Sequence, residues 1–277
     1  MGRARAIRFA RLAAILGGFF ILVAAPEASR AATLQAADVC AADYLVALAR
    51  PGDRLLAPPE ALDPWAPTAG AALEPRGVDA ERLLTHPPSL LVATYGPGRR
   101  VTEMARRLGV PVLILSGHGV VGIADNLMRL AGRLGRSREA EALLDAIPEV
   151  VPEGLRPRAL YVTAGGATAG PGTSMDEVMR LAGFINAAPG PGYPFIDPEW
   201  LLRATPDLLV TAFYDGTADR SAWDLGRSGP FQRVLARLPR IDLPASAVAC
   251  EGPTLLSLAA RLAAEWQALR QEGEGGR

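Results

Sequence analysis

The side chains able to do chemistry in this chain are few in kind. All 29 basic residues are arginine, and no lysine occurs. A Walker-A phosphate loop, a pyridoxal Schiff base and a Ser-x-x-Lys nucleophile all need a lysine amine, so the sequence excludes these three sites. The two histidines, His86 and His118, are too few for a metal site built mainly from imidazoles. We therefore expect no resident metal ion and no cofactor.

Motifs of hydrolytic catalysis are also missing. The sequence holds no Gly-x-Ser-x-Gly elbow and no His-Glu-x-x-His motif, and no histidine is near Ser174 in its Gly-Thr-Ser-Met segment. We expect no catalytic residue and a protein that is not an enzyme. The competing hypothesis is an exported hydrolase with paired carboxylates, which a sequence alone does not reveal.

One glycine-rich segment resembles a dinucleotide-binding loop. Gly117, Gly119 and Gly122 have the Gly-x-Gly-x-x-Gly spacing, after an expected strand and before an expected helix. A Rossmann unit would return about 20 residues later to a second strand that ends in an acid. This chain instead keeps a helical pattern through Leu144. The segment is therefore interpreted as a turn between a strand and a helix.

The N-terminal residues predict export. Residues 1–11 carry four arginines and no acid, an apolar run covers residues 12–25, and Ser29-Arg30-Ala31 fits a cleavage site. The apolar run is shorter than the ~20 residues of a membrane-spanning helix. We predict a signal peptide over residues 1–31, cleaved near Ala31, and a periplasmic protein. A signal anchor is the alternative.

The chain that remains after cleavage is mildly acidic. Residues 1–31 hold five of the 29 arginines and one of the 29 acids, so 24 arginines and 28 acids remain, a net charge of −4. Such a surface has no basic excess for nucleic acid. Cys40 and Cys250 are the only cysteines, and an exported protein meets an oxidising compartment. They either form a disulfide or stay as separate buried thiols, because a sequence does not reveal their Cα separation.

Two segments of the chain are nearly alike. Residues 81–95 and 199–213 match at seven of fifteen positions without a gap, at a constant offset of 118 residues. Each starts at a glutamate, Glu81 or Glu199, and continues with a short helical pattern, a proline and an apolar strand. The match predicts a duplicated α/β lobe. The alternative is that helix–proline–strand units look alike in any α/β protein.

The hydrophobic pattern predicts the elements of two such lobes. Runs typical of buried strands cover residues 34–39, 54–57, 90–94, 110–115, 158–163, 207–212 and 245–249. Apolar residues at helical spacing cover 123–134 and 138–147. We interpret the latter as one long or broken helix that joins the lobes.

Several short motifs follow one another in a recognisable order. In chain order they are residues 38–55, Glu81-x-Leu-Leu, Pro88-x-Leu-Leu-Val, Arg107-Leu-Gly-Val-Pro-Val, Leu130-Ala-Gly-Arg-Leu-Gly, Gly170-x-Gly-Thr-Ser-Met, Glu199-x-Leu-Leu and Cys250-Glu-Gly-Pro. This series resembles class III periplasmic binding proteins, the cobalamin- and ferric-siderophore-type receptors of ABC importers. The resemblance covers nearly all of the chain after residue 31.

The resemblance implies an α/β fold of two Rossmann-like lobes joined by a long helix, with a ligand cleft between them. The N-terminal lobe would cover 32–121, the linking helix 122–150 and the C-terminal lobe 151–277. The implied function is that of an exported, monomeric substrate-binding protein. It would capture a ferric siderophore, haem or cobalamin and deliver it to the dimeric permease of an ABC importer. A haem or metal chaperone with the same fold is a third hypothesis.

A binder of this kind needs aromatic side chains on the loops at the strand ends. The candidates are Trp65, Tyr95, Tyr193, Phe213, Tyr214 and Trp223. Packing inside a lobe is the alternative role for each, and it is the preferred one for Trp200. The resemblance places cleft aromatics at the positions of Tyr95 and Tyr193, which are therefore the preferred candidates.

Polar groups complete the expected cleft. His118 lies just past an expected strand end and is a candidate to face the ligand, with a hydrogen-bonded surface histidine as the alternative. Arg99 and Arg100 suit an anionic siderophore, although adjacent arginines are usually just solvated. His86, beside two prolines, is interpreted as structural.

One further role follows from the resemblance, and one from the positions of the two cysteines. The family carries a glutamate that docks on the permease at the start of the same helix in each lobe, which corresponds to Glu81 and Glu199. Stabilisation of a helix N-terminus through the macrodipole is the alternative role for both acids. Cys40 and Cys250 lie at junctions that should face the groove, so a disulfide between them would tie the two lobes together.

Overall fold

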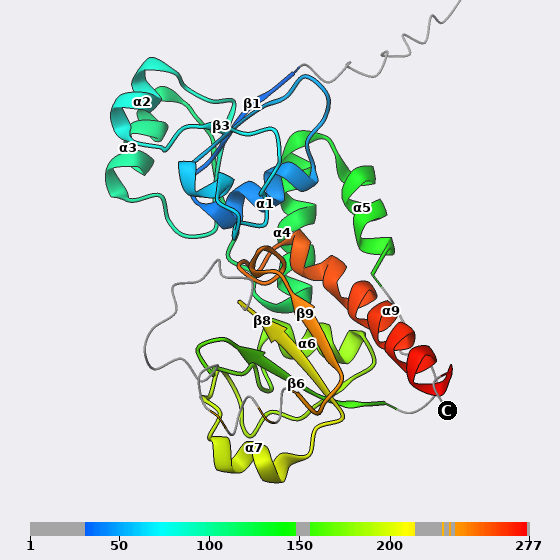
Figure 1. The fold of residues 1–277 in the computed structure, drawn as a ribbon. Helices are drawn as coiled ribbons and strands as arrows, with labels where there is room; N and C mark the ends of the chain where they lie inside the picture. The colour runs from blue at the N-terminus through cyan, green and yellow to red at the C-terminus, as the bar shows by residue number, and fades with distance from the viewer. Residues whose placement is uncertain (1–30, 148–155, 214–228, 230–232, 234–235, 276–277) are drawn as a thin grey trace, which may run out of the picture. The chain divides into compact units, whose positions relative to one another are not determined.

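Two separate parallel sheets organise the chain (Figure 1). The computed structural model describes residues 31–147, 156–213, 229, 233 and 236–275. The first sheet has the strand order β3-β2-β1-β4-β5 and the second β7-β6-β8-β9, and the named strands pair in parallel throughout. This confirms the expected fold class of two α/β lobes.

The strands are short and alternate with helices. The first sheet contains β1 (Thr33–Ala36), β2 (Arg54–Ala57), β3 (Glu74–Pro75), β4 (Leu90–Ala93) and β5 (Val112–Ile114). The second contains β6 (Arg158–Thr163), β7 (Ile185–Asn186), β8 (Leu208–Ala212) and β9 (Arg240–Leu243). The first lobe has helices α1 (Val39–Ala47), η1 (Pro59–Leu62), α2 (Ala80–Thr85) and α3 (Arg99–Leu108). Next come α4 (Gly119–Leu134), α5 (Ser137–Asp145), α6 (Ser174–Leu181), α7 (Pro198–Ala204), η3 (Ala245–Ala247) and α9 (Pro253–Gly275).

The duplication in the sequence is also present in the topology. Without the two-residue strand β3, the orders β2-β1-β4-β5 and β7-β6-β8-β9 are equivalent. The matching segments form the same unit in each lobe, α2 followed by β4 and α7 followed by β8. Asp79 and Asp197, again 118 residues apart, are the N-caps of these two helices. β4 and β8 are buried along their whole length, as expected for central strands of parallel sheets.

One predicted strand is wrong. Residues 245–249 were expected to form it, but the last strand of the second sheet is β9, and residues 245–247 form the short helix η3. Ile241 and Leu243 are buried while Arg240 and Asp242 are exposed, the alternation of a half-buried strand. Pro244 follows directly, and alanine, which dominates the next residues, is uncommon in strands.

The expected joining helix is broken into α4 and α5. Gly135 ends α4 with φ +65°, a left-handed backbone that glycine adopts without a Cβ clash. α4 contacts both lobes. At its start the Val120 N–H donates to Glu177 of α6 at 2.6 Å. Just after its end the Arg136 guanidinium donates to the carbonyl of Leu48 at 2.7 Å, next to the first sheet.

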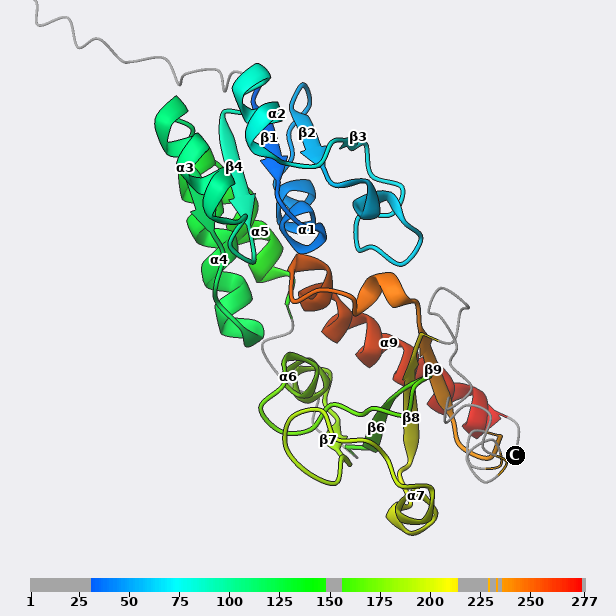
Figure 2. The ribbon, with the colours of Figure 1, turned by 90° about the vertical axis from the view of Figure 1, so that its left-hand side faces the viewer.

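One continuous apolar core extends through both lobes. It includes side chains of β1 and α1 from the first lobe, of β6, β8 and α6 from the second, and of α4 and α9. Figure 2 shows α9 beginning beside α1 and continuing along β9. Burial of this shared apolar surface therefore holds the lobes together in addition to the chain connection. Within the described ranges, no helix is long and apolar enough to cross a membrane.

Candidate ligand-binding site

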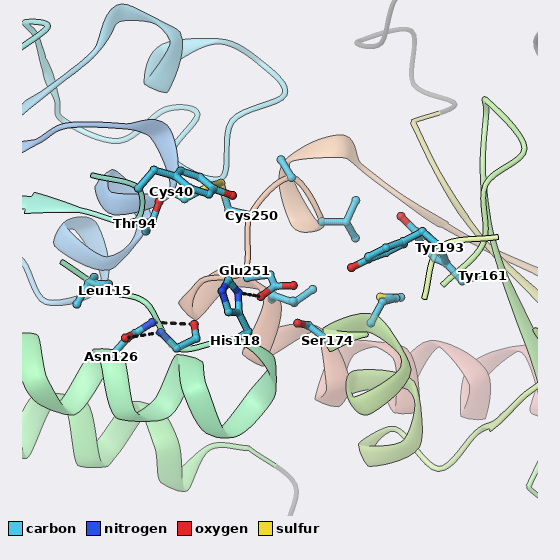
Figure 3. Close-up of a pocket in the computed structure, with 16 residues that line it drawn as sticks. Cys40, Thr94, Leu115, His118, Asn126, Tyr161, Ser174, Tyr193, Cys250 and Glu251 are labelled. Carbon is cyan, nitrogen blue, oxygen red and sulfur yellow. Dashed lines mark hydrogen bonds and ion pairs between the residues drawn. A yellow bond between two sulfur atoms is a disulfide. The ribbon is translucent and has the colours of Figure 1, made fainter. Parts of the chain in front are cut away.

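A cavity of about 290 Å³ lies at the carboxyl ends of strands from both sheets (Figure 3). Three parts of the chain line it. The first is the loops after β4 and β5 with α1 and α4, the second is β6, α6 and the loop before α7, and the third is the segment before α9 with the first turn of α9. The lining residues are Cys40, Thr94, Tyr95, Leu115, Gly117, His118, Asn126, Tyr161, Ser174, Met175, Tyr193, Val248, Ala249, Cys250, Glu251 and Leu255. Open α/β sheets bind ligands at this end of their strands.

Asp38 positions Tyr95 on the first-lobe side. This aspartate is the N-cap of α1, where it accepts from the Ala41 N–H at 2.8 Å. It also accepts from the N–H of Thr94 at 2.8 Å and from its hydroxyl at 2.7 Å. The loop after β4 is thereby held on α1, while the Tyr95 side chain is 71% exposed and faces the cavity.

Two tyrosines form the second-lobe side, and Figure 3 shows them next to each other. Tyr161 is buried on β6, and burial raises its pKa, with the nearby Tyr193 adding to the effect. Tyr193 is more exposed. Burial also raises its pKa, and the charge of Glu251 contributes. Both tyrosines are therefore neutral hydroxyl groups at neutral pH.

The glycine-rich segment is a tight turn that carries His118 to the cavity. A Cβ on Gly117 would approach the carbonyl oxygen of Gly122 to 2.5 Å, so the two ends of the turn pack backbone against backbone. Gly119 has φ +71°, and a Cβ there would meet the Glu177 carboxylate at 2.8 Å. The interpretation of this segment as a structural turn is confirmed.

His118 contacts Glu251, a residue of the segment before α9, and Figure 3 shows the two side chains next to each other. Its Nδ1 lies 3.1 Å from Oε2 of Glu251, and the imidazole side chain is 81% exposed. A chain of hydrogen bonds through the buried side chains of Tyr44 and Asn126 connects the backbone of Glu251 with that of Gly117, next to His118. The Tyr44 hydroxyl donates to the Glu251 carbonyl at 3.1 Å and accepts from Asn126 at 3.3 Å. Asn126 in turn bonds the N–H and the carbonyl of Gly117, at 3.2 and 3.0 Å.

Cys40 and Cys250 form a disulfide that lines the cavity. Their Cα atoms lie 5.3 Å apart although they are 210 residues apart in sequence. The sequence left open whether the two cysteines form a disulfide or remain separate buried thiols, and the structure has the disulfide. The disulfide links α1 of the first lobe to the segment that directly precedes α9, next to Glu251.

Other predicted ligand residues lie outside this cavity. The Trp65 indole donates to Asp63 at 3.1 Å and is half-buried. Phe213 has φ +64° and packs against the core. Arg99 and Arg100 line a different hollow, on α2 and α3. Tyr214 and Trp223 lie outside the described residues, as does the predicted signal peptide apart from Ala31.

The remaining predicted residues lie away from the cavity, on the surface or in lobe packing. Glu81 and Glu199 are exposed in the first turns of α2 and α7. Trp200 packs against the apolar cluster of the second lobe, which agrees with its assignment to packing. His86 is exposed and its Nδ1 lies 3.0 Å from the Thr85 hydroxyl.

Several cavity residues were not among the predicted ligand residues. Tyr161 lies inside a continuous apolar run, where an aromatic residue is indistinguishable from a core residue. Ser174 and Met175 belong to a family-like motif, but their first turn of α6 reaches the cavity only through tertiary packing. Glu251 directly follows Cys250, which was expected to face the groove, and this neighbour was the one sequence signal that could have placed Glu251 at the cavity.

The comparisons with known proteins agree with this architecture. A family model described as "Periplasmic binding protein" matches residues 57–222. A cobalamin-binding protein of Halobacterium salinarum is 27% identical in an alignment 166 positions long, which covers 54% of this chain and 44% of that relative. The chain thus spans less than half the length of the curated relatives it matches.

Solved structures share the fold. The periplasmic haem-binding protein BhuT, in complex with two haems, has a TM-score of 0.58 at 24% identity, over 85% of this chain and 99% of that one. HutB of Vibrio cholerae, a periplasmic haem-binding protein, has a TM-score of 0.64 at 18% identity, over 84% of this chain and 98% of that one. BtuF of Vibrio cholerae, a periplasmic vitamin B12-binding protein, has a TM-score of 0.56 at 19% identity, over 87% of this chain and 98% of that one. With the family model covering more than half of its residues, the chain belongs to the periplasmic binding protein family.

Proposed function

We propose that this chain is an exported substrate-binding protein that holds a metal tetrapyrrole, haem or cobalamin, and delivers it to an ABC importer. The observation that carries the proposal is a cavity with aromatic side chains on both sides. Tyr95 comes from the first lobe, and Tyr161 and Tyr193 come from the second. A flat ring between the lobes would bury apolar surface against aromatic groups on each side.

Charge favours a tetrapyrrole over a ferric siderophore. A strongly anionic ferric complex needs cationic partners, and arginine is absent from the described lining residues. Arg99 and Arg100, which would suit such a ligand, line the other hollow. Paired carboxylates, which the hydrolase hypothesis requires, are also absent from the described lining, where Glu251 is the one carboxylate.

The size of the cavity agrees with a ligand that is partly exposed. Its volume of about 290 Å³ is near the lower end of the ~300–1,000 Å³ typical of ligand pockets. The outer parts of a tetrapyrrole would therefore extend past Tyr95 and Tyr193, whose side chains are 71% and 61% exposed. The names of the relatives include haem-binding and cobalamin-binding proteins, which supports this ligand class, and also one possible iron-binding protein.

Delivery to a membrane permease is the second half of the proposal. Glu81 and Glu199 are exposed acids at equivalent positions of the duplicated lobes, a pair that can contact two equivalent subunits of a permease. The predicted signal peptide and the periplasmic location of the relatives support an exported protein.

A ligand panel tests the proposal. Hemin, aquocobalamin and a ferric catecholate siderophore are titrated separately, with tryptophan fluorescence and melting temperature as the readouts. A tetrapyrrole at 100 times its Kd should stabilise the protein by about 2.7 kcal/mol and stay chemically unchanged. A variant with both Tyr95→Ala and Tyr193→Ala is the control for non-specific adsorption. Binding of the siderophore alone, or conversion of a ligand, would contradict the proposal.

A further inference from the structure

The contact between His118 and Glu251 fixes which ring nitrogen is free. An ionised carboxylate only accepts hydrogen bonds, so the 3.1 Å contact needs a proton on Nδ1 of His118. In a neutral imidazole the lone pair then lies on Nε2. Among the described residues no hydrogen bond reaches Nε2, and the ring is 81% exposed at the cavity. His118 therefore offers an unused nitrogen donor to whatever occupies the cavity.

A histidine held in this way is a typical metal ligand. Histidines that bind metals usually donate their other N–H to a carboxylate, which fixes the tautomer and makes the ligating nitrogen more basic. On the basis of the function proposed above, we propose that His118 coordinates the metal of the bound tetrapyrrole through Nε2 and that Glu251 positions it.

The surrounding structure holds this pair in place. The turn that carries His118 is bonded to Asn126 at both the N–H and the carbonyl of Gly117. Asn126 and the Glu251 carbonyl share the Tyr44 hydroxyl, which burial keeps protonated by raising its pKa to about 12. One buried network thus sets the positions of both partners, as a preorganised metal ligand requires.

The two second-lobe tyrosines of the cavity are weaker metal donors than His118 at neutral pH. A phenol binds a metal well only as the phenolate, and burial raises the pKa of both Tyr161 and Tyr193. The negative charge of Glu251 disfavours a second anion at Tyr193 still further. A neutral imidazole needs no such deprotonation. His118 is therefore preferred to Tyr161 and Tyr193 as the metal donor, and these two tyrosines contact the ring.

A single protein donor is sufficient for a metal ion whose other coordination positions are already filled by the ligand that carries it. The described part of the chain has no group of three or more His, Cys, Asp or Glu residues that could hold a bare metal ion. A metal tetrapyrrole already carries four ring nitrogens and leaves an axial position open, which one histidine can fill. In Figure 3, His118 and Glu251 lie between first-lobe side chains such as Leu115 and the second-lobe tyrosines.

The test compares ligands with and without an accessible metal. Hemin and metal-free protoporphyrin IX are titrated into the wild type, His118→Ala and His86→Ala, the last being the matched control. Aquocobalamin and cyanocobalamin form the second pair, because cyanide blocks an axial position. We expect the wild type and His86→Ala to bind the open-metal ligand at least about tenfold more tightly. The His118→Ala variant should lose this preference and the absorption spectrum of a nitrogen-ligated metal, and added imidazole should restore the spectrum.

Variants at Glu251 test its positioning role. Glu251→Ala should lower the affinity for hemin by about 10–100-fold and that for protoporphyrin IX by a clearly smaller factor, because only hemin needs the positioned imidazole. Glu251→Gln keeps an acceptor for the Nδ1 proton and should recover part of the loss. Unchanged preference and spectrum in His118→Ala, or loss of the spectrum in Tyr193→Phe instead, would overturn the inference. Failure of the wild type to bind either tetrapyrrole would overturn the proposed function and this role with it.

Discussion

Asp43 of α1 accepts two hydrogen bonds from Thr254 in the first turn of α9, one from the N–H at 3.1 Å and one from the hydroxyl at 2.6 Å. The two residues are 211 positions apart in sequence. Cys40 lies one turn before Asp43 on the same helix. The disulfide and the Asp43–Thr254 hydrogen bonds therefore hold the same contact between α1 of the first lobe and the start of α9. Gly252 leaves room for the carboxylate, since a Cβ there would clash with it.

The pH dependence of stability should carry opposite contributions from Asp43 and Asp53. Burial raises the pKa of Asp43, and the bonds from Thr254 only partly oppose it. Ionised Asp43 therefore costs stability at neutral pH, and this cost disappears as the pH falls through its folded pKa towards the unfolded value. Relative to Asp43→Asn, the wild type should gain free energy of unfolding between neutral and mildly acidic pH, measured by urea denaturation.

Asp53 serves as the internal control for that measurement. Burial acts to raise its pKa, but bonds from Arg136 and from the N–H groups of Arg50 and Ala32 outweigh burial and lower it. Its contribution is present above the unfolded pKa and is lost as the pH falls through the folded pKa. The free-energy difference between wild type and Asp53→Asn should therefore shrink on acidification. The same sign for both variants would contradict this assignment.

Arg136→Ala should be the most destabilising of the charge variants. The Arg136 and Asp53 side chains are 1% and 2% exposed, and Nη1 lies 2.7 Å from Oδ2. Removal of one partner leaves a buried charge unpaired, so we expect a loss of about 3–5 kcal/mol in the free energy of unfolding. Arg54→Ala, which breaks an exposed pair with Glu74, is the control and should unfold like the wild type. Equal effects of the two variants would refute the prediction.

The disulfide should stabilise the folded chain strongly. Because it closes a loop of about 210 residues, the chain-entropy model predicts up to ~5 kcal/mol. Cys40→Ser with Cys250→Ser should unfold at a correspondingly lower denaturant concentration than the oxidised wild type. Under reducing conditions the two proteins should converge. Detection of two free thiols in non-reduced, denatured wild type would show that the bridge is absent.

Tyr95 and Tyr193 should each contribute to ligand affinity. We expect alanine at either position to weaken tetrapyrrole binding by about 1–3 kcal/mol, because each loses a large aromatic contact. Phe195→Ala is the matched control, since that side chain is 76% exposed on the same loop and is not among the cavity-lining residues. Equilibrium titration measures all three variants. Wild-type affinity in the Tyr95→Ala, Tyr193→Ala double variant would reject the assignment.

Charge reversal at Glu81 and Glu199 should separate ligand capture from delivery. Both acids are exposed and lie on helices that do not line the cavity, so Glu81→Arg with Glu199→Arg should leave ligand affinity unchanged. Rim charges govern encounter with a partner and its salt dependence, so uptake through the importer should fall. Glu141→Arg, at another exposed acid on α5, is the control. Wild-type uptake by the double variant would mean that these glutamates only stabilise their helices.

Local patterns were sufficient for much of the architecture. The strand over 158–163 was predicted with its observed bounds, because a short apolar run between polar residues is typical of a buried strand in a parallel sheet. The duplication was visible for a similar reason, since Glu81, the proline and the apolar strand recur at a fixed offset in the second lobe. The Gly117–Gly122 turn was correctly interpreted because the helical pattern after it leaves no room for a second strand.

The composition of the cavity depended on contacts between residues far apart in the sequence. Nothing local distinguishes Tyr161 from a core residue or marks Glu251 as the partner of His118, 133 residues away. Arg99 and Tyr95 are four residues apart, yet α3 carries the arginine to a different hollow. The sequence pattern reports which residues are buried and in which element. Packing of the lobes against α4 and α9 decides which side chains meet, because that choice depends on the relative placement of elements.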